Sequence, residues 1–295
     1  MSRGVGVMEP LADLFHPVEP LLALLTQLGD VWFLTMVALV AYWFPDRLPL
    51  ADWDRRQGLR LVAVALLAFA TTHLLKAAFG LPRPVGAGRA AFSLPGPLGP
   101  LYGAAATGTG HAFPSGHAVG TAAVYGVVAL SARGTWRARR RWVALGLVAL
   151  VSFTRLALGV HYLGDVVVGA AVGFVLAALV IGLDARPWHV FVAAGFGTAA
   201  SVLVAPLFVE TAALLGATVG ALAAGWGLAV GGQPAEREPT REVVAVWIVG
   251  AASLLAAPAL AWVGWLTPSV GAAALGGSLL AIGLPATPWA GEKRR

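Results

Sequence analysis

Two histidines and one aspartate have the spacing of a histidine nucleophile with an acid–base partner. His161 and Asp165 are four positions apart, so on one face of a helix the carboxylate can contact the imidazole. A carboxylate on one ring nitrogen fixes the tautomer and leaves the other nitrogen free to attack. His117, in a separate segment, can protonate a departing oxygen and then activate water. These residue types predict covalent catalysis in which His161 is the nucleophile.

Three cations accompany these residues and suit the negative charge of a phosphate. Lys76 and Arg83 belong to one segment, and Arg155 lies six residues before His161. The planar fork of an arginine can bind two phosphate oxygens at once. Because phosphoryl transfer is catalysed mainly by positioning and charge stabilisation, we expect all three cations to bind phosphate oxygens.

The segment that leads into the first histidine has the features of an anion-binding helix start. Pro114 fits the first turn of a helix. Ser115 and Gly116 then offer a hydroxyl and free backbone N–H groups where the helix dipole favours an anion. We expect Ser115 and Gly116 to complete the phosphate-binding site.

Three more polar residues lie close to these segments in the sequence. His73 is one helical turn before the lysine, His111 lies in the loop before the proline, and Thr154 precedes the arginine of the third segment. We interpret all three as possible neighbours of the site. Packing or an interfacial position is the alternative for the two histidines.

The composition indicates which elements must hold these residues. Of the 295 residues, 58% are hydrophobic and only 12% are charged, whereas soluble domains carry about 25% charged residues. Apolar runs approach the roughly 20 residues that a membrane-spanning helix needs. We therefore predict an all-α, polytopic membrane helical bundle. Its expected spans cover residues 31–45, 58–79, 114–132, 142–159, 163–183, 189–208, 211–230, 243–265 and 268–286.

Two connecting segments differ from the expected spans. Residues 9–28 could cross the membrane, lie at its interface, or enter and return. Residues 81–113 read as a long loop, rich in glycine, proline and alanine, that could act as a lid.

The alternation of spans places fifteen of the twenty cations on one side of the membrane. These are Arg47, Arg55, Arg56, Arg60, Arg133, Arg137, Arg139, Arg140, Arg141, Arg186, Arg237, Arg241, Lys293, Arg294 and Arg295. Because lysine and arginine accumulate in cytoplasmic loops, this side is expected to be the cytoplasm. The three segments that carry the candidate site residues are remote in sequence, and the alternation of spans places all of them at the outer face. The net charge of +6 is explained without nucleic acid as a partner.

The three segments together resemble the signature motifs of the type 2 phosphatidic acid phosphatase superfamily, which includes vanadium haloperoxidases and glucose 6-phosphatase. They read Lys-x6-Arg-Pro, Pro-Ser-Gly-His and Arg-x5-His-x3-Asp, and the resemblance covers roughly residues 30–185. The third motif usually begins Ser-Arg, whereas here it begins Thr154-Arg155, which keeps the hydroxyl.

This resemblance implies a phosphohistidine intermediate on His161, oriented by Asp165, with His117 as the general acid. It implies a phosphate cradle made of Lys76, Arg83, Ser115, Gly116 and Arg155. It also implies independence from metal ions, so we expect neither a metal nor another cofactor. The family fold implies a core of about six helices, which we assign to residues 1–187. Residues 188–295 are expected to add about four C-terminal spans.

The sequence therefore predicts a multi-pass plasma-membrane phosphatase with its active site on the extracytoplasmic side. Its partners would be the bilayer and a lipid phosphate, either a polyprenyl diphosphate or a lipid like phosphatidic acid. One alternative is a phosphotransferase that passes the phosphoryl group to another alcohol. A second is a binder or transporter without catalysis, although a binder has no need of His117 together with the His161–Asp165 pair. Lipid identity and oligomeric state stay open.

Overall fold

The computed structural model describes residues 6–45, 53–96, 98–131 and 137–204, and this part of the chain contains helices and no β-strand. The prediction of an all-α fold is confirmed for these residues. The elements are α1 (Met8–Phe15), η1 (His16–Val18), α2 (Glu19–Leu25), η2 (Thr26–Gly29), α3 (Val31–Trp43), α4 (Arg55–Phe79), α5 (Leu98–Ala106), α6 (Gly116–Leu130), α7 (Arg137–Ala157), α8 (Leu163–Gly182) and α9 (Pro187–Val204).

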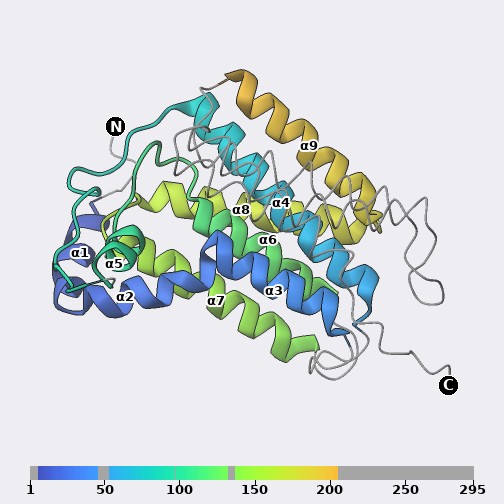
Figure 1. Ribbon diagram of the computed structural model, residues 1–295, viewed down its shortest axis with the longest axis horizontal. Coiled ribbons are helices and arrows are strands. Elements are labelled where there is room, and N and C mark those ends of the chain that lie inside the picture. Colours follow the sequence, from blue (N-terminus) through green and yellow to red (C-terminus); the bar gives the residue numbers. More distant parts are fainter. Residues whose placement is uncertain (1–5, 46–52, 97, 132–136, 205–295) are drawn as a thin grey trace.

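Helix α6 lies at the centre of the bundle and packs against α3, α4, α7 and α8 (Figure 1). Two glycines of α8 allow its close approach to α6. A Cβ atom on Gly169 would lie 2.8 Å from the carbonyl oxygen of Ser115, and one on Gly173 would overlap the carbonyl oxygen of Val119. This close packing places the start of α6 directly against the start of α8.

Two of the described helices, α4 and α8, are long and apolar enough to cross a membrane. The segment Met8–Gly29 with α3 would be a third span, bent by 43° at its break, and α6 is a shorter apolar helix. These helices identify a membrane protein. They do not reach the predicted number of spans within the described residues, and the spans expected at 211–230, 243–265 and 268–286 lie outside them.

The N-terminal segment is broken rather than continuous. Pro17 and Pro20 occupy the first turns of η1 and α2, where a residue without an N–H group is tolerated but a longer preceding helix cannot continue. The expected loop 81–113 also needs correction, because it contains α5. Leu98, Leu101, Tyr102 and Ala105 recur at helical spacing in this segment.

Helix α9 corresponds to the predicted span 189–208 and packs along α4. Val190, Phe191 and Ala194 join the same core cluster as residues of α3, α4 and α6. The boundary between a core of 1–187 and a C-terminal region of 188–295 stays a prediction.

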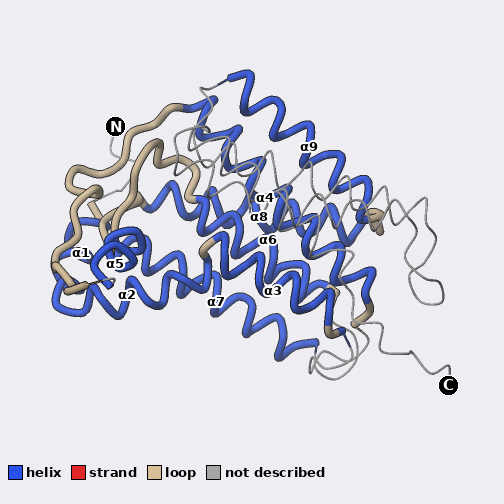
Figure 2. The backbone as a smooth tube through the Cα atoms, viewed as in Figure 1, coloured by secondary structure: helices blue, strands red, loops and turns tan. Residues whose placement is uncertain are grey.

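The two ends of the bundle are built differently. At one end, Arg60 of α4 pairs with Asp184, which follows α8, and its Nε donates to the carbonyl oxygen of Ala185 at 2.9 Å. Arg56 reaches the same carboxylate at 3.5 Å. We call these four residues the α4–α8 clamp. At the opposite end α1, α2, α5 and the adjoining loops gather (Figures 1 and 2).

Candidate active site

The three sequence motifs converge at the end of the bundle that carries α1, α2 and α5. The guanidinium Nη1 of Arg83 lies 3.1 Å from His161 Nε2 and donates to the carbonyl oxygen of Val160 at 2.9 Å. The backbone N–H of Ser115 donates to the carbonyl oxygen of Asp165 at 2.9 Å. Segments that follow α4, precede α6 and connect α7 to α8 therefore form one site.

His161 is held in a single orientation, and it is only 2% exposed. Its Nδ1 lies 3.5 Å from the Oδ2 of Asp165. Arginine has only donors, so the Nε2 that faces Arg83 must be an acceptor and the ring proton is assigned to Nδ1. The result is the tautomer that a nucleophilic Nε2 requires.

The expectation that His161 and Asp165 share a helical face was wrong in detail. His161 lies in the turn before α8, whereas Asp165 lies in the first turn of this helix. The carboxylate also accepts the backbone N–H of Tyr162 at 3.0 Å, a helix-start interaction that fixes its position. The turn brings the imidazole back over the carboxylate, so the contact exists without a shared helix.

The electrostatic surroundings keep His161 neutral. Burial lowers the pKa of its imidazole well below the ordinary value, and the positive charges of Arg155, Arg83 and Lys76 lower it further. A neutral imidazole has an unshared electron pair on Nε2 at physiological pH. These surroundings make the ring a competent nucleophile.

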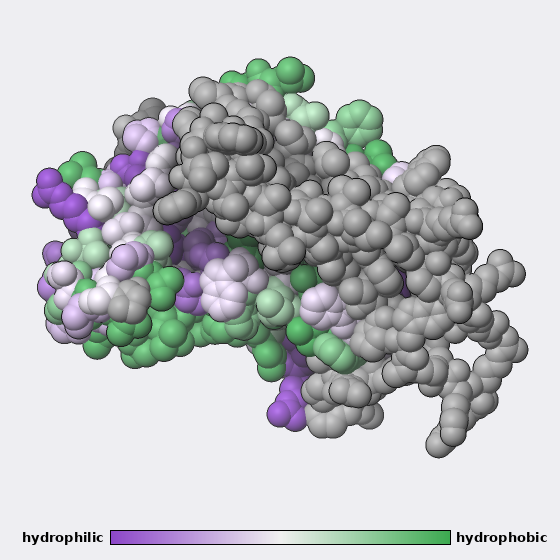
Figure 3. Space-filling view, viewed as in Figure 1, coloured by the Kyte–Doolittle hydropathy of each residue, from purple (hydrophilic) through white to green (hydrophobic). Residues whose placement is uncertain are grey.

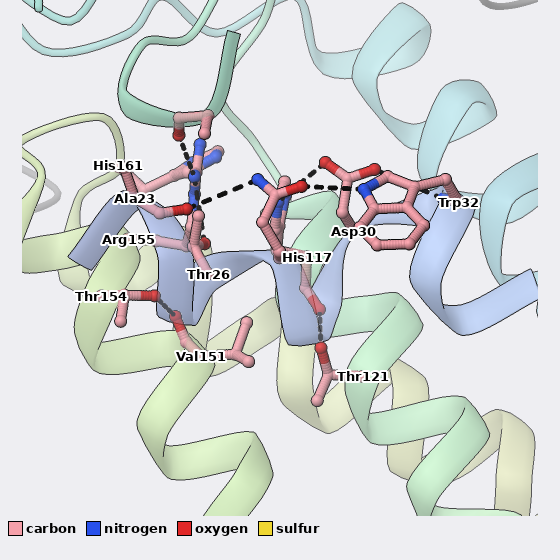
Figure 4. A network of polar contacts seen from close by, with 12 residues as sticks. Ala23, Thr26, Asp30, Trp32, His117, Thr121, Val151, Thr154, Arg155 and His161 are labelled. Carbon is pink, nitrogen blue, oxygen red and sulfur yellow. Dashed lines mark hydrogen bonds and ion pairs between the residues drawn. The ribbon is translucent and has the colours of Figure 1, made fainter. Parts of the chain in front are cut away.

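Arg155 lies deep in the site and is 3% exposed. Its Nη1 donates at 3.2 Å to the hydroxyl of Thr26 (Figure 4). It also donates at 3.2 Å to the carbonyl oxygen of Ala105. Its Nε is buried and finds no acceptor among the described residues. Because a buried donor without a partner costs free energy, the guanidinium is suited to bind an anionic ligand, to which Nε can donate.

Ser115 is fully buried, and its hydroxyl has no hydrogen-bond partner in the described part of the chain. It is the N-cap residue of α6, so Pro114 precedes the helix instead of starting it, which corrects the prediction. Its backbone N–H is not free either, since Asp165 accepts it. The Ser115 hydroxyl and the helix start at Gly116 remain as groups for an anion.

The two remaining cations lie in the last turn of α4 and in the loop that follows this helix. Lys76 is half-buried in the last turn of this helix, and its charge acts on His161. The Arg83 Nε donates to the carbonyl oxygen of Thr109 at 2.9 Å. A Cβ atom on Gly108 would lie 2.5 Å from the Arg83 guanidinium, so any larger residue there would displace the end of this side chain.

The three expected neighbours take different positions. Thr154 is buried, but its hydroxyl donates to the helix carbonyl oxygen of Val151 at 2.7 Å. His111 is exposed in the loop before α6. His73 lies half-buried on α4, one turn before Lys76.

Sequence reasoning missed one carboxylate of the site. Asp30 caps α3, accepting the backbone N–H of Trp32 through Oδ1 at 3.4 Å. Its Oδ2 lies 3.5 Å from the Nε2 of His117 (Figure 4). An aspartate before an apolar run is a helix-start signal, but nothing in the sequence indicates that this one faces His117.

A cap made of α1, η1, α2, η2 and α5 covers the site. The carboxylate of Glu19 accepts the Tyr102 hydroxyl at 2.5 Å and the backbone N–H of Ala91 at 2.8 Å. Burial and then Glu19 raise the pKa of Tyr102 to about 12, so its hydroxyl stays a donor. Thr26 and Ala105 connect both halves of the cap to Arg155.

A scan against protein families matches residues 57–188 to the PAP2 superfamily. Comparison with curated proteins finds no match, and comparison with solved structures finds none either. The matched segment contains all three motifs and excludes Asp30 together with most of the cap.

Proposed function

We propose that this chain, whose residues 57–188 belong to the PAP2 superfamily, removes phosphate from a membrane lipid through a phosphohistidine on His161. The superfamily includes phosphatases that act on phosphate esters, and the apolar helices identify a membrane protein. We propose in addition that the substrate is a lipid and that the reaction passes through a covalent intermediate.

One observation carries the proposal. The neutral Nε2 of His161 lies beside Arg83, with Asp165 on the other ring nitrogen. Arg155 Nε and the Ser115 hydroxyl are buried in the same site and have no hydrogen-bond partner among the residues that the structure describes. A nucleophile surrounded by cations and unpaired donors is suited to a phosphate and has little other use.

The reaction would proceed in two balanced steps. In the first, His161 Nε2 attacks phosphorus, an N–P bond forms, the bond to the leaving oxygen breaks, and His117 gives that oxygen a proton. In the second, water attacks phosphorus, its proton passes to His117, and the N–P bond breaks to release phosphate. Arg83, which contacts Nε2 here, would turn to the phosphate oxygens on binding.

The apolar surface of the cap supports a lipid as the substrate. Leu14, Leu21 and Leu24 of α1 and α2 are all more than half exposed, and hydrophobic side chains gather at this end in Figure 3. Such side chains suit contact with acyl chains, so the tail of a substrate can stay in the bilayer while its phosphate enters the site. A phosphatidic acid-like lipid and a polyprenyl diphosphate both meet this description.

The cation distribution supports an outward-facing site. Within the described residues, Arg137, Arg139, Arg140 and Arg141 lie at the start of α7, and Arg155 lies at its other end, beside His161. The positive-inside rule assigns the arginine-rich start of α7 to the cytoplasm. The proposed location is therefore the plasma membrane, with hydrolysis on the extracytoplasmic side.

Phosphate release from purified protein in detergent tests the proposal. The panel should contain phosphatidic acid, a lysolipid phosphate, a polyprenyl diphosphate and water-soluble esters, each with and without an acceptor lipid. We expect release from lipid phosphates without an acceptor, inhibition by orthovanadate and full activity in a chelator. Release only when an acceptor is present would indicate a phosphotransferase, and binding without release would indicate a non-catalytic protein.

The intermediate can be detected directly. Denaturation in alkaline detergent after brief exposure to a lipid labelled in its phosphate should leave label on the protein that is stable to base and is lost on later treatment with acid, as expected of an N–P bond. Peptide mapping should locate it at His161. Label on a different residue would refute the assigned nucleophile.

A further inference from the structure

Asp30 joins the site from outside the three motifs. It lies at the break between η2 and α3, and its two carboxylate oxygens face different partners. Oδ1 faces the backbone N–H of Trp32, and Oδ2 faces His117 Nε2. The side chain of Asp30 is 32% exposed and that of His117 is 22% exposed, but the Nε2 atom is buried and Asp30 Oδ2 faces it at 3.5 Å, beyond hydrogen-bond geometry.

Helix capping alone does not explain this carboxylate. Asp54 caps α4 with a short hydrogen bond of 2.7 Å to the backbone N–H of Gln57, whereas the capping contact of Asp30 is 3.4 Å long. The usual length for such a bond is about 2.7–3.2 Å. Asparagine or serine caps a helix about as well as aspartate, so capping by itself does not require a negative charge here.

The surroundings of His117 indicate what the negative charge of Asp30 does. Burial most of all, then Arg155 of α7 and Lys76 of α4, oppose a positive charge on its imidazole, whereas Asp30 favours one. A general acid must carry a proton when the substrate binds. Among the described groups that act on His117, Asp30 supplies a negative charge, which offsets part of this opposition.

The contact also distinguishes the two ring nitrogens. An ionised carboxylate only accepts, so the nitrogen that faces it carries a hydrogen. With Nε2–H directed at Asp30, Nδ1 is left as the nitrogen that exchanges a proton with the substrate. The arrangement mirrors the other histidine, where Nδ1 faces Asp165 and Nε2 is the reacting nitrogen.

We propose that Asp30 is a positioning residue for His117, orienting its ring and stabilising its protonated form for protonation of the leaving oxygen. The inference rests on the proposed phosphatase function and adds a residue from outside the matched family segment. Asp30 itself exchanges no proton with the substrate.

The test compares two esters with different leaving groups. A lipid phosphate releases a poorly stabilised alkoxide and needs a general acid, whereas p-nitrophenyl phosphate releases a stable phenolate and needs little help. We expect Asp30→Asn to lower kcat/KM for dioctanoyl phosphatidic acid by about 10- to 100-fold and to change that for p-nitrophenyl phosphate by less than about 3-fold. The ratio kcat/KM is used because it covers the steps up to departure of the leaving group.

Three further variants exclude a structural explanation. Asp30→Ser also keeps the cap and removes the charge, so it should reproduce Asp30→Asn. Asp54→Asn makes the same change at the cap of α4 and should leave both esters unaffected. The double variant Asp30→Asn/His117→Ala should be no slower than His117→Ala, because residues that act through one another are not additive.

The outcomes separate the inference from the function on which it rests. If the wild type hydrolyses neither ester, the proposed function has failed and the role of Asp30 falls with it. If the wild type is active and His117→Ala loses the lipid ester selectively, wild-type behaviour of Asp30→Asn overturns the inference alone. Equal losses on both esters, or multiplied losses in the double variant, overturn it as well.

Discussion

The two ends of this helical bundle use buried arginine in opposite ways. In the α4–α8 clamp, Arg60 is buried against the carboxylate of Asp184 and a carbonyl oxygen, so its charge is neutralised within the protein. At the other end Arg155 is buried as deeply, yet its hydrogen-bond acceptors among the described residues, Thr26 and Ala105, offer neutral oxygens, and the carboxylate of Asp30 acts on it through charge alone.

This difference distinguishes structural charges from binding charges. Burying a cation is expensive, and a protein normally compensates it with a nearby carboxylate, as the clamp does. An arginine left with neutral partners keeps its attraction for an anion that arrives later. The partners of a buried arginine therefore indicate its role better than its burial does.

The largest expected effect concerns His161, the proposed nucleophile at the end of the bundle that carries the candidate active site. His161→Ala removes the nucleophile, so kcat should fall by about 10⁴-fold or more, measured as phosphate release from a lipid phosphate. His189→Ala makes the same change on the exposed surface of α9 and should leave kcat within about 2-fold. Unchanged hydrolysis in the His161 variant would mean that this end of the bundle does not carry the active site.

The second prediction tests the arginine comparison itself. Arg155→Met should lower kcat/KM by about 100- to 1000-fold with little loss of thermal stability, because a buried cation with neutral partners is removed. Arg60→Met should do the reverse. It removes the donor to the Ala185 carbonyl oxygen and the ion pair with the exposed Asp184 carboxylate, so it should lower the unfolding temperature, while kcat/KM of the folded protein changes little.

These two variants are matched because each replaces a buried arginine by an unbranched apolar side chain. Differential scanning fluorimetry in detergent gives the stability, and initial rates at several lipid concentrations give kcat/KM. If both variants lose stability and activity to the same degree, the distinction between structural and binding arginines does not hold in this protein.

The third prediction uses pH to separate the two ends. The pKa of His161 is lowered in the folded state. At a pH below about 6.5, the ordinary pKa of a histidine, His161 is therefore protonated in the unfolded chain and neutral in the folded protein. Stability should therefore fall as pH decreases from 7 to 5, by at most about 1.4 kcal/mol per pH unit for this group. The pKa of Asp184 is also lowered, chiefly by Arg60, but stability from an aspartate is lost only as pH falls below about 3.8.

The unfolding temperature measured from pH 7 to pH 3 checks both signs. His161→Gln should flatten the decline between pH 7 and pH 5 without affecting the acidic part of the curve. Asp184→Asn should leave the decline between pH 7 and pH 5 in place. An unaltered slope in the His161 variant would show that this imidazole is not held neutral by folding.

Much of this arrangement was predictable from the sequence because the relevant signals are local. Apolar runs predicted α3, α4, α6, α7 and α8 to within a few residues, apart from α7, which begins at Arg137 rather than at 142. Their closeness in the sequence suggested that His161 and Asp165 are neighbours, although a turn and not a shared helix brings them to 3.5 Å. Alternation of spans then placed the three motifs at one end, which the structure shows.

What the sequence did not predict depends on contacts between remote segments. Asp30 reaches His117, and Thr26 reaches Arg155, only because the N-terminal segment bends at its break and folds over the site. A capping aspartate and a threonine have many ordinary uses, so neither indicates a partner. The helix α5 was hidden within a segment rich in glycine and proline, whose composition favours a loop.

The smallest expected effect compares the ends of a single helix. On α8, a Cβ atom at Gly169 would lie 2.8 Å from the carbonyl oxygen and 3.4 Å from the backbone nitrogen of Ser115, whereas one at Gly182 would meet nothing within 4 Å. Gly169→Ala must push the start of α6 away, so it should cost about 1–3 kcal/mol of stability and lower kcat/KM through a displaced Ser115. Gly182→Ala should be neutral or slightly stabilising, because alanine is the better helix former. Thermal unfolding and phosphate-release rates of both variants measure this, and equal behaviour would show that the close approach of α8 to Ser115 does not position the site.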